Sequence, residues 1–409
     1  MVREMPVYLL ATLDTKGAEA AFVREELTAA GVNVVLVDTG CVGTPAAGAD
    51  VTREQVFSAA GTTLSELVER GDRGEAVKTA AAGAARIVAD AFAAGRVSGV
   101  LALGGSAGTT IGTAAMRALP LGVPKLMVST LASGQVRHWV GDKDICMFNS
   151  VVDILGINRI SRGVLSSAAR AMAGMVTIAP GASIGSDDKP LVAATMFGVT
   201  TPCVQRAREV LEQAGYEVLV FHATGNGGQA MESLVADGLF AGVLDITTTE
   251  LADELVGGVL SAGPDRLTAA ARSGVPQVVS VGATDMVNFH APETVPAGFR
   301  SRRFYEHNPT VTLMRTTAEE NARLGAEIGR KVAASTGPAA LMLPLAGVSA
   351  IDIAGGPFDD PAARAALFDA IRAHHGSVEL VELDCHINNP RFAEAAAAKL
   401  IELMSVKKR

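Results

Sequence analysis

A glycine-rich segment around residue 105 has the composition of an anion-binding loop. Gly104-Gly105-Ser106-Ala107-Gly108-Thr109 follows an apolar run and opens a segment with helical periodicity. Glycines let main-chain amides approach an anion closely, and the first turn of a helix supplies unpaired N–H groups and a favourable dipole. A tight turn with a hydroxyl cap would use the same residues. We favour a ligand loop, which is not a P-loop because the Gly-Lys-Ser/Thr ending is absent.

A second polar segment, Thr12-Leu13-Asp14-Thr15-Lys16, follows the first expected strand. Lys16 could contact a phosphate as a point charge, and Asp14 could hold a metal or a hydroxyl group. Alternatively, Asp14 or Thr15 caps the next helix and Lys16 is solvated. Ligands of open α/β sheets bind beyond the carboxyl ends of the strands, so this segment is expected at the same site as the glycine-rich loop.

Two further segments are expected at the same edge. Asp38-Thr39 ends the second strand, where an acidic residue commonly meets a ribose hydroxyl, although the spacing is not that of a Rossmann fingerprint. Ser133-Gly134 follows the fourth strand and adds small polar groups. The expected cofactor-binding residues are Thr12, Asp14, Thr15, Lys16, Asp38, Thr39, Gly104, Gly105, Ser106, Gly108, Thr109, Ser133 and Gly134.

The second half of the chain contains another glycine-rich loop, from His222 to Glu232. Thr224, Gly225, Asn226, Gly227 and Gly228 precede a helix and are expected to bind an anionic substrate. His222 and Glu232 are candidate proton-transfer groups, which makes them, with Lys16, the expected catalytic residues. The alternatives are a hydrogen-bonded histidine at a strand end and a glutamate that complements the helix dipole.

A long polar stretch without clear periodicity runs from Thr284 to Thr310, and loops of this length are usually lids or binding loops. Its Arg302, Arg303 and His307 are expected to recognise a carboxylate or phosphate, unless they are ordinary solvated charges. His386, beyond the last expected strand, is a further candidate for substrate binding. No His-Glu-x-x-His motif or tight histidine cluster occurs, so we expect no metal site formed by the protein alone.

The chain contains an internal repeat. Segments near Leu10, Ser98 and Leu121 are echoed near Ala193, Ala241 and Ser273, and each copy has a strand–helix–strand–helix–strand pattern. The fully apolar strands favour parallel sheets covered on both faces. The predicted fold is α/β, with two Rossmann-like lobes of mainly parallel sheets flanked by helices and a ligand cleft between them.

The expected boundary is the turn-rich segment Gly181–Pro190, which gives a nucleotide-binding domain at 1–182 and a substrate domain at 183–409. The first lobe is expected to have strands at 7–12, 34–38, 99–103 and 125–129, with a possible closing strand at 175–179. The second lobe is expected to have strands at 191–195, 217–221, 242–246, 277–281, 340–344 and 377–382.

Composition restricts the class of protein. Hydrophobic residues make up 49% of the chain and charged residues 19%, which allows two large cores. A net charge of −8 and an aromatic content of 4% argue against nucleic-acid binding. The four scattered cysteines, the absence of an N-terminal signal pattern and the lack of an uninterrupted apolar span favour a cytoplasmic protein without membrane contact.

Taken together, the Ala-Thr-Leu-Asp-Thr-Lys-Gly17 opening, the Gly104 loop, the His222–Glu232 segment, Gly355–Asp359 and the ending Asp384–Pro390 resemble one family. It is the Tm-one-like ATP-binding domain family, typified by a plant tobamovirus-resistance protein, with bacterial members of unassigned reaction. The resemblance spans essentially the whole chain. It implies two α/β lobes, ATP binding and a homodimer or higher homo-oligomer. In the plant protein the corresponding domain looks like a binder of a viral replication protein.

Some relatives carry an additional C-terminal barrel domain that resembles phosphoenolpyruvate-utilising enzymes. This chain ends at Lys407-Lys408-Arg409 without one, so an activity that needs it would require a separate barrel-domain partner.

We therefore expect an ATP-binding protein, with Mg²⁺ as companion ion, that acts on a small anionic metabolite as an ATP-dependent transferase or ligase. The reaction would be phosphoryl transfer or ATP-driven acid activation, with Lys16 and the Gly104 loop stabilising phosphate charge. One alternative is a nucleotide-responsive interaction module without turnover. Another is an ATP-independent hydrolase or isomerase of an organic acid.

Overall fold

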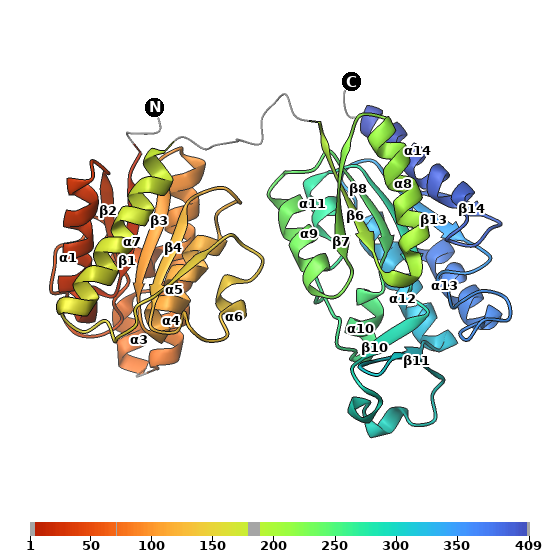
Figure 1. The fold of residues 1–409 in the computed structure, drawn as a ribbon, viewed down its shortest axis with the longest axis horizontal. Coiled ribbons are helices and arrows are strands. Elements are labelled where there is room, and N and C mark those ends of the chain that lie inside the picture. Colours follow the sequence, from red (N-terminus) through yellow and green to blue (C-terminus); the bar gives the residue numbers. More distant parts are fainter. Residues whose placement is uncertain (1–4, 71, 179–188, 407–409) are drawn as a thin grey trace. The chain divides into compact units, whose positions relative to one another are not determined.

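The chain forms two compact units, Met1–Ser183 and Ile184–Arg409. The computed structural model describes residues 5–70, 72–178 and 189–406, with the side chains of 68–70 and 406 excepted. Each unit has its own parallel sheet with helices on both faces (Figure 1). The expected boundary segment, 181–190, falls largely outside the described residues.

The first unit contains a five-stranded parallel sheet in the order β2-β1-β3-β4-β5. Its strands are β1 (Val7–Ala11), β2 (Val34–Asp38), β3 (Gly99–Gly104), β4 (Lys125–Ser129) and β5 (Cys146–Asn149). Its helices are α1 (Leu13–Ala29), α2 (Arg53–Ala59), α3 (Leu64–Arg70), α4 (Arg73–Ala93), α5 (Ser106–Arg117), α6 (Arg137–Val140) and α7 (Arg159–Thr177). Helices α1 and α7 pack on one face of the sheet and α2, α4 and α5 on the other.

The second unit repeats this topology and extends it to six strands, in the order β14-β13-β9-β8-β6-β7. These strands are β6 (Leu191–Met196), β7 (Glu217–His222), β8 (Gly242–Thr247), β9 (Gln277–Gly282), β13 (Ala339–Pro344) and β14 (Glu379–Leu383). A separate antiparallel sheet, β10-β12-β11, contains β10 (Met286–Phe289), β11 (Phe304–Asn308) and β12 (Val311–Arg315).

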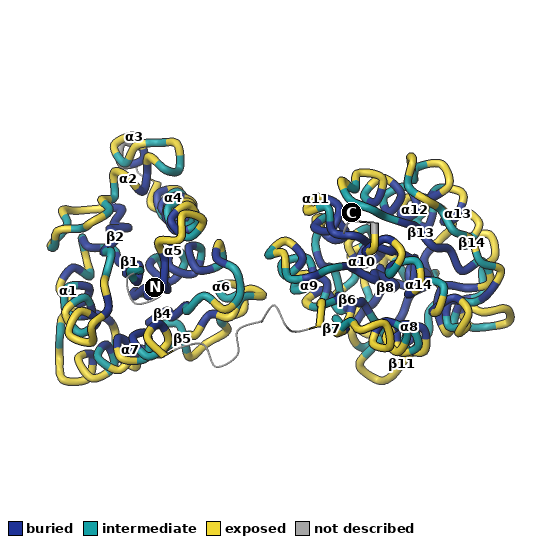
Figure 2. The backbone as a smooth tube through the Cα atoms, turned by 90° about the horizontal axis from the view of Figure 1, so that it is seen from above, coloured by how far each residue is buried: buried dark blue, intermediate teal, exposed yellow. Residues whose placement is uncertain are grey.

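Helices cover both faces of the six-stranded sheet. They are α8 (Thr201–Gln213), α9 (Asn226–Ala236), α10 (Glu250–Val256), α11 (Ala269–Ser273), α12 (Ala318–Ala333), α13 (Pro361–His374) and α14 (Pro390–Val406). Short 3₁₀ turns occur at η2 (Gly198–Thr200), η3 (Pro292–Thr294) and η4 (Ala297–Phe299). Helices α8 and α14 share one core, while α12 and α13 belong to the core of the opposite face. The central strands of both sheets are buried throughout, as expected for parallel sheets covered on both faces (Figure 2).

The α/β fold with two parallel-sheet domains is confirmed. The strand orders β2-β1-β3-β4 and β7-β6-β8-β9 match one another, which agrees with the repeat in the sequence. None of the described helices has the length and apolar character needed to cross a membrane.

Three sequence predictions were wrong. No strand closes the first unit at 175–177, because these residues complete α7. The edge strand β5 was missed, since its four residues are only half-buried and lack a clear pattern. The stretch from Thr284 to Thr310 is not one loop, because it contains the short strands β10 and β11, which both pair with β12.

Candidate functional site

A pocket lies at the carboxyl edge of the first sheet, between the segments that follow β1 and β3. The chain passes from β1 to β2 on one side and then to β3 on the other, so the strand order reverses here. Open α/β sheets bind ligands at such positions. The pocket has a volume of about 230 Å³. It is lined by Thr12, Asp14, Thr15, Lys16, Cys41, Val42, Arg73, Val77, Gly105, Ser106, Ala107 and Gly108.

The N-terminus of α5 forms one wall of this pocket. Gly105 precedes the helix, and no side chain caps its first turn. The amides at the start of α5 are therefore available to an anion. Gly104 is required for packing, because a Cβ there would lie 2.8 Å from the Cα of Gly108. A Cβ on Gly105 would meet nothing closer than the Thr130 hydroxyl at 3.7 Å.

Two cationic side chains line the pocket. Lys16 lies at a kink in the first turn of α1, where its φ of −128° and ψ of 21° depart from helical values. Arg73 is the first residue of α4, whose N-terminus is capped by Asp72 through a 3.0 Å hydrogen bond from the amide of Glu75. Within the described residues, neither Lys16 nor Arg73 has an ion-pair partner. Both charges are therefore available to a ligand.

Asp14 and the loop after β2 are held together at the pocket wall. The carboxylate of Asp14 accepts a hydrogen bond from the amide of Val42 at 2.8 Å. The guanidinium of Arg53 donates to the carbonyls of Val42 and Gly43 at 3.1 and 2.9 Å. These bonds fix the loop against α1, and they leave lone pairs of Asp14 free for another partner.

Asp38 supports this loop from beneath and does not line the pocket. Its buried carboxylate accepts hydrogen bonds from the amides of Leu13 and Gly40 at 3.0 and 2.8 Å. Burial raises the pKa of Asp38, while these two amides and Arg53 act in the opposite direction. Burial and the nearby carboxylates raise the pKa of Cys41 to about 11, so its thiol is protonated and unreactive at neutral pH.

The structure brings together Thr12, Asp14, Thr15, Lys16, Gly105, Ser106 and Gly108 from the set expected to bind the cofactor. Gly104 and Thr109 lie beneath the pocket, where the Thr109 hydroxyl contacts the Gly105 carbonyl at 2.8 Å and the Ser129 hydroxyl at 2.7 Å. Asp38 and Thr39 are buried, and Ser133 and Gly134 are exposed outside the lining.

Five lining residues were not predicted from the sequence, namely Arg73, Val77, Cys41, Val42 and Ala107. Arg73 carried a detectable signal. A helix that leads from one parallel strand to the next begins at the carboxyl edge, so the first residue of α4 has to lie near the ends of β1 and β3.

In the second unit, amides of the glycine-rich loop donate hydrogen bonds to a carboxylate of the protein itself, that of Glu250. The buried carboxylate of Glu250 accepts hydrogen bonds from the amides of Gly225 at 2.7 Å and Gly228 at 3.1 Å. A Cβ on Gly228 would overlap this carboxylate, so the close approach requires glycine. The expected role of these two amides in substrate binding is therefore not supported, because Glu250 occupies them.

Glu250 belongs to a buried ion-pair network centred on Arg266. The guanidinium of Arg266 contacts Asp245 at 2.5 and 2.7 Å, Glu250 at 2.7 Å and Glu232 at 3.2 Å. Asp245 also accepts a 2.7 Å hydrogen bond from Thr195 on β6. The network occupies the β6–β8 position, the counterpart of the pocket between β1 and β3.

Glu232 is held by hydrogen bonds from the main chain. Its two carboxylate oxygens accept hydrogen bonds from the amides of Leu267, Thr268 and Ala269 at 2.6, 3.1 and 2.7 Å. The carboxylate thereby caps the start of α11, in addition to pairing with Arg266. These contacts give no support to a proton-transfer role.

The other expected residues of the second unit do not form one site. Arg302 pairs with Glu320 at 2.6 Å, and Arg303 donates to the carbonyl of Asp359 at 3.1 Å. His386 uses both ring nitrogens, with the carbonyl of Ser349 at 2.8 Å and the amide of Asn388 at 3.1 Å. His307 is exposed on β11, and exposed His222 packs against Phe197.

The remaining expected substrate residues belong to the turn after β7. The Thr224 hydroxyl donates to the His222 carbonyl at 3.3 Å, Asn226 is exposed, and Gly227 packs against the main chain of His222. Because β7 is an edge strand, this turn corresponds to the loop after β2 and not to the Gly104 loop. The true counterpart of the Gly104 loop is Thr247–Glu250, which follows β8 and is fully buried.

The small sheet packs near the carboxyl ends of β8, β9 and β13. Asp253 accepts hydrogen bonds from the amide and side chain of Asn288 on β10, at 3.0 and 2.7 Å. Asp285, just before β10, accepts a 2.8 Å hydrogen bond from Ser349. Burial raises the pKa of Asp253 to about 7, and burial together with Asp352 raises the pKa of Asp285 to about 7.

Comparison with known proteins identifies the family. Residues 5–180 match the model of the N-terminal domain of an uncharacterised protein family, UPF0261, and residues 189–404 match its C-terminal domain. The chain belongs to the UPF0261 family. A UPF0261 protein of Clostridium tetani is 49% identical over 400 residues, covering 97% of this chain and 98% of that protein.

The chain is also similar to plant proteins. The ToMV resistance protein Tm-1(GCR237) of Solanum lycopersicum is 45% identical over 313 residues, covering 75% of this chain and 42% of that protein. A putative UDP-N-acetylglucosamine 2-epimerase structure from Listeria monocytogenes covers 99% of this chain and 96% of its own, with 11% identity and a TM-score of 0.23. A TM-score this low bears on no function of the UPF0261 chain.

Proposed function

We propose that the first domain binds ATP together with Mg²⁺ in the pocket between β1 and β3. We further propose that the protein is a cytoplasmic enzyme that transfers a phosphoryl group to a small anionic metabolite or activates such an acid. The proposal rests on the groups that line this pocket together. The uncapped N-terminus of α5 lines the same pocket as Lys16 and Arg73, two cations that have no ion-pair partner among the described residues.

The charge of the lining favours a polyphosphate. Lys16 and Arg73 contribute two positive charges and Asp14 one negative charge, so the ionisable side chains sum to +1 (2 − 1), cysteine being neutral. The dipole of α5 adds to this positive potential. Lys16 would stabilise charge that develops on a transferring phosphoryl group, since phosphoryl-transfer catalysis consists mainly of positioning and electrostatic stabilisation.

The size of the pocket favours the phosphate part of a nucleotide. Its volume of about 230 Å³ is smaller than the sites that enclose drug-sized ligands, which begin at about 300 Å³. The nucleoside would therefore extend beyond the pocket, where Val42 and Val77 offer apolar contacts.

Asp14 is the only carboxylate among the lining residues and would be the protein's ligand to Mg²⁺. The described residues contain no cluster of three or more potential metal ligands. A single carboxylate is sufficient for this role, since Mg²⁺ usually binds proteins through one or two carboxylates plus substrate phosphates. The ion would neutralise phosphate charge when it is bound with the nucleotide.

Gly105→Asp tests the ATP site. Position 105 has a φ of −81° and room for a side chain, and aspartate is a favourable residue before a helix, so the variant should fold. Its carboxylate would repel phosphate at the start of α5. Isothermal titration calorimetry with ATP and Mg²⁺ should show loss of binding, by at least about tenfold for a charge placed in the site.

Gly105→Ala is the steric control and should retain most of the affinity. ATP binding of unchanged strength in Gly105→Asp would refute the assignment of the pocket. Turnover is tested separately, by incubating the protein with ATP and pools of small acids and detecting ADP, AMP or phosphate.

A second candidate, a nucleotide-responsive interaction module, is favoured by the second domain. Its expected proton-transfer residue Glu232 and the amides of Gly225 and Gly228 are all engaged within the protein. Such a module would bind ATP in calorimetry and show no product with any acid pool. The name of the tomato relative, a resistance protein, is compatible with this candidate.

We also propose a homodimer that forms through α7 and the segment before it. Five of the eight large exposed apolar side chains among the described residues occur there, and large exposed apolar surfaces mark interaction sites. They are Val151, Leu155, Ile160, Met175 and Ile178, with exposed fractions of 42–73%. Val151 also has a φ of +65°, which is unfavourable for a β-branched residue.

A further inference from the structure

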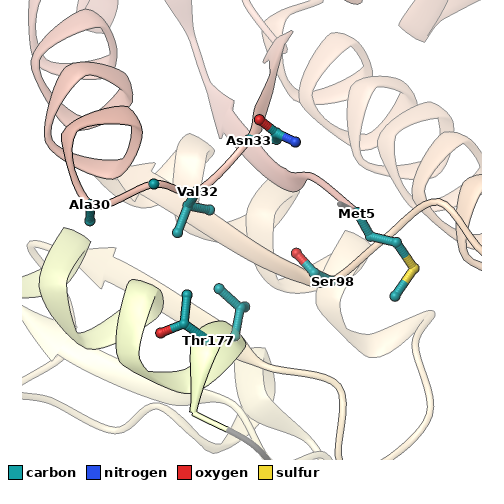
Figure 3. Close-up of a pocket in the computed structure, with 8 residues that line it drawn as sticks. Met5, Ala30, Val32, Asn33, Ser98 and Thr177 are labelled. Carbon is teal, nitrogen blue, oxygen red and sulfur yellow. The ribbon is translucent and has the colours of Figure 1, made fainter. Parts of the chain in front are cut away.

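A second pocket of the first domain lies at the opposite, amino edge of its sheet. Its volume is about 360 Å³. It is lined by Met5 before β1, by Ala30, Gly31, Val32 and Asn33 between α1 and β2, by Ser98 before β3, and by Val176 and Thr177 at the end of α7 (Figure 3). None of the described residues in this lining carries a charged side chain, so they differ in chemistry from the lining of the pocket at the carboxyl edge.

The hydroxyl of Ser98 is the one polar side-chain atom in the described part of the first domain that is buried without a hydrogen-bond partner. Ser98 is 8% exposed, and Figure 3 shows its oxygen directed toward the space between Val32 and Thr177. An unsatisfied buried hydroxyl is unfavourable unless a ligand or an ordered water completes its hydrogen bonds. Its position points to a ligand in this pocket.

Two helices end at this pocket, because Ala30 after α1 and Thr177 at the end of α7 are among its lining residues. The carbonyl of Ala30, after α1, and that of Thr177, at the end of α7, accept no hydrogen bond from the described residues. Neither helix has a basic residue in its last turn. The negative ends of both helix dipoles therefore lack a compensating charge from their own helices, which favours a cation.

We propose that this pocket binds the protonated amino group of a small organic amine. The ammonium group donates to the Ser98 hydroxyl and to carbonyls at the ends of α1 and α7, while Met5, Val32 and Val176 contact its short apolar body. An anion is disfavoured, because the pocket presents acceptor groups and the negative ends of two helix dipoles. The site is independent of the proposed ATP site, which lies at the other edge of the sheet.

The terminal methyl group of Met5 provides a local measurement. In protein labelled with ¹³C at the methionine methyl groups, the Met5 signal is assigned by its loss in Met5→Leu. Butylammonium, which is protonated at neutral pH as lysine is, should shift this signal saturably. Butyrate at the same ionic strength should produce no saturable shift, and 1-butanol should bind more weakly than the amine.

Two variants locate the amine within the pocket. Ser98→Ala removes the hydroxyl and should weaken butylammonium binding about tenfold, the effect of a hydrogen bond to a charged group. Thr177→Trp fills the pocket from an exposed position and should abolish the shift. Ser167→Ala, an exposed serine elsewhere on α7, should bind like the unmodified protein.

An unshifted Met5 signal at high amine concentration would overturn the proposal, as would an equal saturable shift with butyrate. Unchanged affinity in folded Ser98→Ala would overturn the assignment of the hydroxyl, and unchanged binding in Thr177→Trp would overturn the location. Calorimetry of the same variants with ATP keeps the two sites distinguishable, since none of these substitutions touches the carboxyl-edge pocket.

Discussion

Arg266 and Asp245 form a two-pronged ion pair in the interior of the second domain, with N–O distances of 2.5 and 2.7 Å. Both side chains are essentially inaccessible to solvent. The pair lies at the β6–β8 position, where the topology of an open α/β sheet would otherwise place a ligand. In the second domain, side chains of the protein itself therefore occupy the position at which such a sheet would bind a ligand.

We predict that Arg266→Ala destabilises the second domain by about 3–5 kcal/mol, because it leaves buried carboxylates without their cation. Urea unfolding followed by circular dichroism measures the loss. Arg272→Ala is the matched control, since Arg272 is 67% exposed and lies 3.8 Å from Asp265. Its effect should stay within about 1 kcal/mol, as for other surface ion pairs. Equal losses in both variants would contradict the importance of the buried network.

We predict one ATP per chain. The pocket between β1 and β3 is open, whereas its counterpart in the second domain is closed by Arg266, and Glu250 takes the amides of Gly225 and Gly228. Calorimetric titration should give a stoichiometry near one, and a separately produced second domain that folds should not bind ATP. Two equivalent sites per chain would be incompatible with this geometry.

The sequence revealed only one of the two cationic residues that line the pocket between β1 and β3. Lys16 was predicted from the sequence because its segment follows the apolar first strand. A segment in that place lies at the carboxyl edge of a parallel sheet. Arg73 was missed, because it follows two short helices, α2 and α3, that the sequence pattern did not reveal. The helix that begins at Arg73 leads to β3, which indicates the carboxyl edge of the sheet, but the approach of Arg73 to this pocket also depends on how α4 packs beside α5.

We predict that Lys16→Ala and Arg73→Ala each lower ATP affinity about tenfold, because hydrogen bonds to charged groups contribute about 1.5–3 kcal/mol. The double variant should lose more than either single variant. Lys78→Ala, on an exposed part of α4, is the control and should bind normally. Normal binding by Arg73→Ala would remove Arg73 from the proposed site.

We predict that the second domain loses stability as the pH rises from about 4 to 7. The pKa of Asp285 is raised to about 7 when folded, so the folded state holds a proton that the unfolded state has released. Stability therefore falls across this range and levels off above it. Asp285→Asn should reduce the slope of unfolding free energy against pH by up to about 1.4 kcal/mol per unit. An unchanged slope would show that Asp285 is ionised in the folded protein.

We predict that Leu155→Glu combined with Met175→Glu shifts the protein from dimer to monomer. Both side chains are exposed and apolar, and charges there would have to be desolvated in an interface. Sedimentation velocity measures the change. Val259→Glu and Ile353→Glu, at exposed apolar positions of the second domain, should leave the oligomeric state unaltered. A monomeric unmodified protein would refute the proposed dimer.

The sequence was most informative where strands are buried on both faces. β2 and β4 were predicted with their observed bounds, because a short continuous apolar run that ends at polar or glycine residues is typical of a strand covered on both faces. The strands β10, β11 and β12 were missed, since each is short and exists through its neighbours in a small antiparallel sheet.

The loop of the second domain shows a different limit of sequence reasoning. Gly225 and Gly228 were expected to bind an anionic substrate, and the sequence could not reveal that their amides donate to Glu250. The two positions are 25 and 22 residues from Glu250 along the chain and meet it only after β8 has been placed. A glycine-rich loop therefore indicates that its amides bind an anion, but it does not tell whether the anion is a ligand or a side chain of the protein.

The first domain is formed by one continuous stretch of the chain, and this affects when it can fold during translation. All five of its strands and its last helix come from residues up to Thr177, and 232 residues of this sequence (409 − 177) follow that helix. Domains generally fold as units during translation, the N-terminal one first. The pocket between β1 and β3 can thus form on the ribosome while the second domain is still being made.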